Sequence, residues 1–205
     1  MIEVRGVVKR HEQHVVFDGL DLAWEGPGIV CICGPNGSGK TTLLSMLAGA
    51  SSPDAGDIRL MGTSLVHLPH TALPLVAYVP DGCPVYPFLT GREWLDLTRS
   101  VRACDAGVEQ ELLARFGLVQ LLDTRFDAMS LGTAKKFLLT AALMCDTAIL
   151  IMDEPTNGLD KRSFDVLKEL LERRKTSGLI VLSCHDLAQQ RQLGARAVDL
   201  PGLGR

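Results

Sequence analysis

A nine-residue stretch of the sequence, GPNGSGKTT, has the residue types and the spacing needed to hold a phosphate group. It matches the pattern G-x-x-x-x-G-K-[ST] and follows IVCIC, an apolar run at 29–33 that predicts a buried strand. Glycines let the backbone wrap a phosphate with its N–H groups pointing inward, and the N-terminus of a following helix adds partial positive charge. Lys40 can reach the terminal phosphates of a nucleotide, and the Thr41 hydroxyl can bind Mg²⁺. The predicted phosphate loop consists of Gly34, Pro35, Asn36, Gly37, Ser38, Gly39, Lys40, Thr41 and Thr42.

Two adjacent carboxylates, Asp153 and Glu154, directly follow a second apolar run, AILIM. This run, at 148–152, predicts a strand of a parallel sheet that is buried on both faces. Ligands bind at the carboxyl ends of such strands. Asp153 suits Mg²⁺, bound through water opposite Thr41. Glu154 suits a general base or a positioning group for water that attacks a γ-phosphate. The alternative for both is an acidic helix cap.

A third stretch, MSLGTAKK at 129–136, precedes an apolar run and predicts the start of a helix near Thr133. The free N–H groups at a helix N-terminus favour an anion, with Ser130 as a hydroxyl donor and Gly132 allowing close approach. The alternative is an ordinary helix capped by Ser130. Two lysines at 135 and 136 oppose the helix dipole in a first turn, which favours an anion at this place.

The elements that must position these residues alternate between strand and helix, which predicts an α/β fold. Strands are expected at 29–33, 75–80, 148–152 and 179–183, helices at 40–50 and 161–175, a hairpin that turns at 61–62, and mostly helix over 81–145.

Length and composition favour one domain outside the nucleic-acid-binding class. The chain has 205 residues, 21 basic against 24 acidic residues, a net charge of −3 and a pI near 5.9. No apolar run approaches the roughly 18 residues of a membrane span, and the N-terminus does not resemble a secretory signal, so a cytoplasmic protein is expected. The six cysteines form no CxxC pair, which favours reduced structural thiols over a metal site or a disulfide framework.

With GPNGSGKTT, MSLGTAKK, AILIMDEPTNGLD and VLSCHD in this order, the chain resembles the ATP-binding subunits of ABC transporters, and exporter-type subunits in particular. The resemblance covers nearly the whole chain. It implies a single domain, 1–205, with a P-loop NTPase (RecA-like) α/β core that has a parallel sheet and a small antiparallel β part. The core would comprise 1–80 and 137–205, and an inserted helical subdomain, 81–136, would carry the signature motif.

The resemblance also implies ATP and Mg²⁺ as cofactors and further site residues. In this family two domains pack head to tail, and the phosphate loop of one faces the signature of the other. The signature, usually LSGGQ, corresponds here to Ser130, Leu131, Gly132 and Thr133, which would act in trans. His185 matches the switch histidine that contacts the γ-phosphate. Asp160 matches the loop that couples the two sites, and its alternative role is an N-cap of the next helix.

Two positions depart from the family pattern. Asp81 stands where the family usually has a glutamine that links Mg²⁺ to the helical subdomain; an aspartate can still serve Mg²⁺ as a ligand but couples differently. His11 stands where the family often has an aromatic residue that stacks on adenine, and its alternative is a solvated loop histidine. Phe17 is expected in the core.

The function implied by the resemblance is ATP binding and hydrolysis that drive substrate movement, in the export direction, by separate integral membrane permease subunits. The chain would form a homo- or heterodimer with a second ATP-binding subunit, would dock its permease over 81–128, and would sit peripherally on the inner face of the cell membrane. The short segment after His185 predicts no added regulatory domain. A haem-exporter-type subunit is a competing subtype.

Two other functional classes fit the sequence less well. Soluble ABC ATPases of translation or DNA maintenance usually have two cassettes, long coiled coils or a basic face, none of which the sequence shows. A P-loop kinase needs an acceptor site and an arginine-rich lid, and it has no need for MSLGT.

Overall fold

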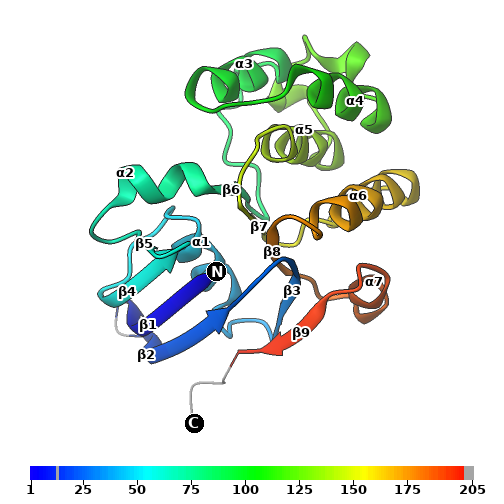
Figure 1. The fold of residues 1–205 in the computed structure, drawn as a ribbon. Coiled ribbons are helices and arrows are strands. Elements are labelled where there is room, and N and C mark those ends of the chain that lie inside the picture. Colours follow the sequence, from blue (N-terminus) through cyan, green and yellow to red (C-terminus); the bar gives the residue numbers. More distant parts are fainter. Residues whose placement is uncertain (13, 201–205) are drawn as a thin grey trace.

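A computed structural model describes residues 1–12 and 14–200 of the chain. Two β-sheets lie side by side, and most helices gather on the far side of the second sheet (Figure 1). The first sheet is antiparallel, in the order β2-β1-β4-β5, and the second is parallel, in the order β6-β7-β8-β3-β9. The strands are β1 (Ile2–His11), β2 (His14–Trp24), β3 (Gly28–Cys33), β4 (Ala55–Leu60), β5 (Thr63–Ser64), β6 (Val76–Val79), β7 (Ile149–Met152), β8 (Leu179–Ser183) and β9 (Arg196–Asp199).

Seven α-helices connect or cover these strands. They are α1 (Lys40–Leu47), α2 (Pro69–Ala72), α3 (Gly91–Val101), α4 (Ala106–Phe116), α5 (Leu131–Leu143), α6 (Lys161–Arg174) and α7 (Leu187–Gln192) in the described ranges 1–12 and 14–200. Short 3₁₀ turns occur at Leu73–Leu75, Val119–Leu121 and Phe126–Ala128.

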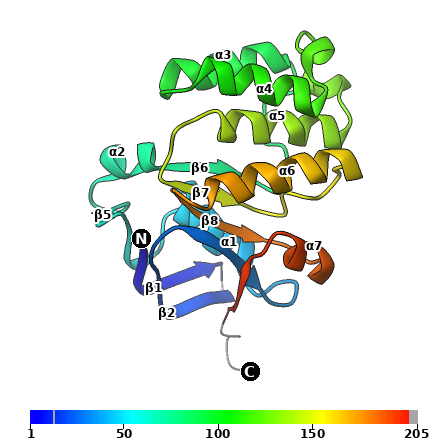
Figure 2. The ribbon, with the colours of Figure 1, turned by 45° about the vertical axis from the view of Figure 1, so that its right-hand side comes forward.

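Helix α1 lies between the two sheets and has its first turn at the phosphate loop (Figure 2). Leu43, Leu44 and Leu47 are fully buried in one apolar cluster that also contains Ile2 of β1 and Val181 of β8. Burying a leucine side chain contributes about 1.5–3 kcal/mol. The apolar face of KTTLLSML therefore fixes α1, and with it the phosphate loop, against both sheets.

Helix α5 joins the helical region to the parallel sheet, because it packs against α3, α4 and β6. Phe137 is fully buried at its centre and packs edge-on against Phe126, which in turn packs against Trp94 of α3. The expected boundary between 136 and 137 falls inside this helix. The division into a core, 1–80 and 137–205, and a helical subdomain, 81–136, therefore cuts a continuous element, and it stays a prediction.

The expected strands and helices are present, with small differences at their ends. A hairpin joins β4 and β5 and has Met61 in the left-handed region at φ 49°. The helix after the phosphate loop ends at Leu47 rather than at residue 50, since Gly49 follows it with φ 71°. The sequence-based prediction does not include strands β1, β2 and β9 or helices α2 and α7. Among the described residues, no helix is long and apolar enough to cross a membrane.

The six cysteines are free thiols. Cys104 and Cys145 face each other across an isolated bridge between two extended residues, with their Sγ atoms 3.1 Å apart. That distance is longer than the 2.03–2.05 Å of a disulfide. Burial raises the pKa of the Cys145 thiol to about 12, so this thiol stays protonated at neutral pH.

Candidate functional site

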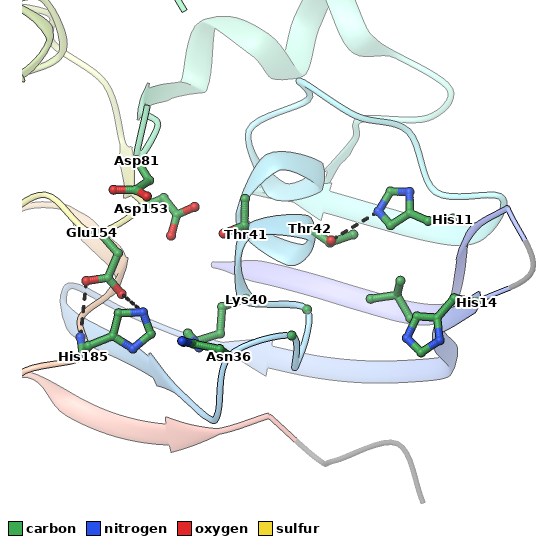
Figure 3. A pocket seen from close by; sticks show the side chains of 13 residues that line it. His11, His14, Asn36, Lys40, Thr41, Thr42, Asp81, Asp153, Glu154 and His185 are labelled. Atoms are coloured by element: carbon green, nitrogen blue, oxygen red, sulfur yellow. Dashed lines mark hydrogen bonds and ion pairs between the residues drawn. The ribbon is translucent and has the colours of Figure 1, made fainter. Parts of the chain in front are cut away.

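A cavity of about 480 Å³ opens where the phosphate loop meets the carboxyl ends of β6, β7 and β8 (Figure 3). Its volume falls in the range of pockets that hold small ligands. Most of the residues predicted from the motifs meet in it. The lining consists of His11, His14, Val16, Asn36, Gly37, Gly39, Lys40, Thr41, Thr42, Asp81, Asp153, Glu154 and His185. Gly34, Pro35 and Ser38 belong to the loop but lie outside this lining.

The phosphate loop needs a glycine at position 39. This residue has φ 91°, and a Cβ atom there would lie 2.7 Å from the Phe17 ring and 2.8 Å from Val16. Phe17 is buried, as expected of a core residue, and supports the loop. The Lys40 ammonium donates to the Gly34 carbonyl at 2.8 Å and to the Pro35 carbonyl at 3.0 Å, so it is held inside the loop. This arrangement presents a cation and the first-turn N–H groups of α1 to one side of the cavity.

Asp153 is placed to serve a cation. It is only 1% exposed, and one of its oxygens, Oδ1, accepts a hydrogen bond from the Ser183 hydroxyl at 2.5 Å. Its other oxygen, Oδ2, is buried and has no hydrogen-bond partner within the described part of the chain. The carboxylate points toward Thr41 (Figure 3). Carboxylate and hydroxyl oxygens are ligands that Mg²⁺ prefers, so Thr41 and Asp153 fit this ion.

Glu154 lies beside Asp153 and faces His185. Glu154 is 5% exposed, and burial raises the pKa of its carboxyl group above the usual range for a glutamate. His185 Nε2 lies 3.1 Å from Glu154 Oε1, and the His185 backbone N–H donates to Glu154 Oε2 at 3.3 Å (Figure 3). A carboxyl whose proton affinity is raised, at the wall of a cavity, is suited to accept a proton from water.

Comparison with known proteins decides the family. The model of the family described as "ABC transporter" matches residues 17–157. The chain is 36% identical over 201 residues to the Nod factor export ATP-binding protein I of Paraburkholderia xenovorans (strain LB400), covering 94% of this chain. The chain belongs to the ABC transporter ATP-binding family. This membership sets aside the P-loop kinase hypothesis.

Other relatives in the family agree with this assignment. The cytochrome c biogenesis ATP-binding export protein CcmA of Paramagnetospirillum magneticum (strain ATCC 700264 / AMB-1) is 35% identical over 181 residues, which cover 83% of this chain and 81% of that protein. The chain spans 65% of the length of the Paraburkholderia xenovorans protein and 62% of the length of the Nod factor export ATP-binding protein I of Ralstonia nicotianae (strain ATCC BAA-1114 / GMI1000). A solved ATP-binding subunit of an ABC transporter superimposes with a TM-score of 0.88 at 27% identity, covering 98% of this chain and 85% of that chain.

The fold is also that of a dimeric ATP-binding cassette solved in a post-hydrolysis state with ADP and Pi. That structure superimposes with a TM-score of 0.79 at 24% identity, covering 98% of this chain and 94% of that chain. The expected α/β P-loop NTPase fold, with its parallel sheet, small antiparallel part and helical region, is therefore confirmed.

The signature segment of this ABC protein opens α5 and lies outside the lining of the cavity. The Ser130 hydroxyl caps α5 by accepting from the Thr133 N–H at 3.2 Å, and the helix begins at Leu131 rather than near Thr133. A Cβ atom at Gly132 would lie 2.3 Å from the Gly158 carbonyl oxygen, so this glycine is required by packing inside the chain. Action of the signature in trans stays a prediction.

The two lysines after the signature bind groups of the same chain, a role that the sequence-based interpretation does not include, and an anion site at this helix start stays a prediction. Lys135 is 1% exposed, and its ammonium donates to the Pro80 carbonyl at 2.8 Å and the Asp81 carbonyl at 2.6 Å. These two residues directly follow β6. Lys136 pairs with Asp160 at 3.0 Å. Both cations thus bind groups of the same chain, because tertiary packing supplies the partners that a local pattern does not reveal.

The two positions that depart from the family pattern both reach the cavity. Asp81 accepts a hydrogen bond from the Asn157 side chain at 3.1 Å, and its carboxylate lies 3.9 Å from the Lys135 ammonium. His11 Nε2 lies 3.4 Å from the Thr42 hydroxyl oxygen. Their roles, in Mg²⁺ binding or coupling and in adenine stacking, stay predictions. His14 lines the cavity beside His11 and was not predicted, because a lone histidine carries no signal of its position.

Asp160 caps α6 by accepting from the Ser163 N–H at 2.8 Å, and this bond together with Lys136 lowers its pKa to about 2. We expect Asp160→Ala to lower the free energy of unfolding by about 1 kcal/mol, and Asp160→Asn to lower it less, since asparagine keeps the cap but loses the pairing of the carboxylate with Lys136. Urea denaturation at neutral pH measures both.

The stability contribution of Asp160 depends on pH. Because the pKa of its carboxyl group is lower in the folded than in the unfolded protein, the carboxylate stabilises the fold above the unfolded pKa of about 3.9. This stabilisation is lost as pH falls toward 2. An Asn variant as unstable as the Ala variant would show that the ion pair, not the cap, matters.

Proposed function

We propose that this chain binds ATP with Mg²⁺ and hydrolyses it as the nucleotide-binding subunit of an ABC transporter. The observation that carries the proposal is the shared cavity, in which Lys40, Thr41, Asp153, Glu154 and His185 meet. One wall offers a cation and helix N–H groups to phosphates, and the opposite wall offers a carboxylate for a metal ion and a second carboxylate for water.

The residues would divide the work as follows. Lys40 and the loop amides bind the terminal phosphates. Thr41 and Asp153 hold Mg²⁺, which when bound neutralises phosphate charge in the transition state. Glu154 orients the attacking water and accepts its proton, while His185 holds the Glu154 carboxylate toward the γ-phosphate. The raised pKa of Glu154 makes it a better proton acceptor than an exposed glutamate.

The names of the relatives support a proposal for the process that ATP hydrolysis drives. Two are named for export, of Nod factor and in cytochrome c biogenesis, which supports export as the direction. The partners would be integral membrane permease subunits and a second ATP-binding subunit, either another copy or a related chain. The protein would then lie peripherally on the cytoplasmic face of the membrane, with the region 81–128 toward the permease. Asp160 and Asp81 would couple the two ATP sites and the helical region.

Lys40→Ala tests the proposal directly. We expect ATP affinity to fall about 10–100-fold, since a hydrogen bond to a charged group contributes about 1.5–3 kcal/mol, and hydrolysis to be lost. Calorimetric titration with ATP measures the affinity, and phosphate release measures the turnover. Lys168→Ala, on α6 and outside the cavity lining, is the control and should behave as the wild type. Unchanged ATP binding by Lys40→Ala would overturn the assignment of the loop.

A further inference from the structure

Ser183, the last residue of β8, is fully buried and lies next to both carboxylate residues of the site. Its hydroxyl donates to Asp153 Oδ1 at 2.5 Å and accepts from the backbone N–H of Glu154 at 2.9 Å. A hydroxyl carries one proton and two lone pairs, so it can make both hydrogen bonds at once. One side chain therefore holds the side chain of Asp153 and the backbone of Glu154 together.

The first hydrogen bond fixes the direction of the Asp153 carboxylate. Oδ1 is occupied by Ser183, while Oδ2 is buried without a partner in ranges 1–12 and 14–200 and is left for the cavity. A buried carboxylate without this bond could rotate about its last side-chain torsion, which is broad. The bond to Oδ1 thus selects one orientation of the carboxylate, which lies on the side of Thr41 (Figure 3).

The second hydrogen bond holds an unusual backbone conformation. Successive residues of a strand point to opposite faces, yet Asp153 and Glu154 both line the same cavity. Glu154 achieves this with φ 45°, in the left-handed region that costs a non-glycine residue energy. The bond from its N–H to Ser183, and the bond from the His185 N–H to its carboxylate, hold the residue in this turn.

We propose that Ser183 is a positioning residue that sets Asp153 for Mg²⁺ and Glu154 for water through its two hydrogen bonds. The inference rests on the proposed function, because it assumes that Mg²⁺ and ATP bind in this cavity. It is distinct from a packing role, since a residue that only fills space would not change the dependence of ATP affinity on Mg²⁺.

The chain contains a matched control. Ser64 is also buried, donates to Asp57 Oδ1 at 2.5 Å and accepts the backbone N–H groups of Val66 and His67 at 3.2 and 3.0 Å. It lies in β5 of the antiparallel sheet, outside the cavity lining. Ser64→Ala therefore removes one donated hydrogen bond to a carboxylate and two accepted backbone hydrogen bonds, a set similar to that of Ser183, without touching the site.

The test compares the full-length wild type, Ser183→Ala and Ser64→Ala by calorimetric titration with ATP, in MgCl₂ and in EDTA, and by phosphate release. In Ser183→Ala, we expect the gain in ATP affinity from EDTA to MgCl₂ to be about 10–100-fold smaller than in the wild type. We expect kcat to fall by a similar factor. Such losses are typical when a residue that orients a metal ligand is removed. The ATP affinity of Ser183→Ala in EDTA should match the wild type. Ser64→Ala should keep both the Mg²⁺ effect and kcat.

An intact Mg²⁺ effect and kcat in Ser183→Ala would overturn the inference and leave Ser183 a packing residue. If that variant does not fold, Ser183→Cys, which is similar in size and a weaker donor, must show the same loss or the inference is wrong. A wild type that binds no ATP would instead refute the proposed function, and the inference with it.

Discussion

Replacing Glu154 by glutamine is expected to slow ATP hydrolysis by about 10²–10⁴-fold, which is the usual contribution of a positioned base. Glutamine keeps the size and the hydrogen-bonding capacity of the side chain but cannot accept a proton. Glu154 lies at the wall of the cavity, where burial raises the pKa of its carboxyl group. His185 Nε2 lies 3.1 Å from Glu154 Oε1. ATP binding should persist, because Lys40 and the phosphate loop are unchanged.

A second consequence of Glu154→Gln is that the ATP-bound dimer should accumulate, since hydrolysis would no longer reopen it. Light scattering with and without ATP measures this, alongside phosphate release. Glu172→Gln is the matched control, because Glu172 lies on α6 and pairs with Lys175 away from the cavity. A Glu154→Gln protein that hydrolyses ATP at the normal rate would place the base elsewhere.

The parts of the fold that the sequence predicted are those with strong local patterns. The apolar runs at 29–33, 148–152 and 179–183 became β3, β7 and β8, because continuous apolar runs are typical of strands buried on both faces. The phosphate loop was predictable because its glycines and Lys40 follow one strand at fixed spacing. The carboxylates were predictable because they follow another strand.

The parts that could not be predicted depend on contacts between distant segments. From the local sequence, Lys135 is a cation near the start of a helix. In the structure it is buried, and its ammonium donates to the two backbone carbonyls that follow β6. Ser183 reads as one more small residue of a buried strand, and its partners lie 29 and 30 positions away. The only local sign was a hydroxyl at the end of an apolar strand, two residues before His185. The sequence predicts that Gly132 allows an anion to approach closely. The structure shows that a Cβ atom there would collide with the Gly158 carbonyl oxygen of the same chain.

This last contact changes how action of the signature in trans should be tested. A substitution at Gly132 would disturb the Gly158 loop of the same chain, so its effect would not report on a partner subunit. Leu131 is better placed, since it is 57% exposed in the first turn of α5. A carboxylate there favours the helix, so Leu131→Glu should fold. In a closed dimer it would face the γ-phosphate held by the other subunit, where like charges repel strongly.

The central prediction, that the signature of one subunit completes the ATP site of another, is tested most directly by mixing Lys40→Ala with Leu131→Glu and measuring phosphate release. Each variant alone should be inactive, while ATP binding to Leu131→Glu and turnover by the neutral control Leu131→Gln should be largely kept. A mixed dimer carries both lesions in one composite site and leaves the other intact. The mixture should recover up to about a quarter of wild-type turnover, because half of randomly assorted dimers are mixed and each keeps one of its two sites. A fully active Leu131→Glu protein, or a mixture no more active than its components, would contradict this prediction.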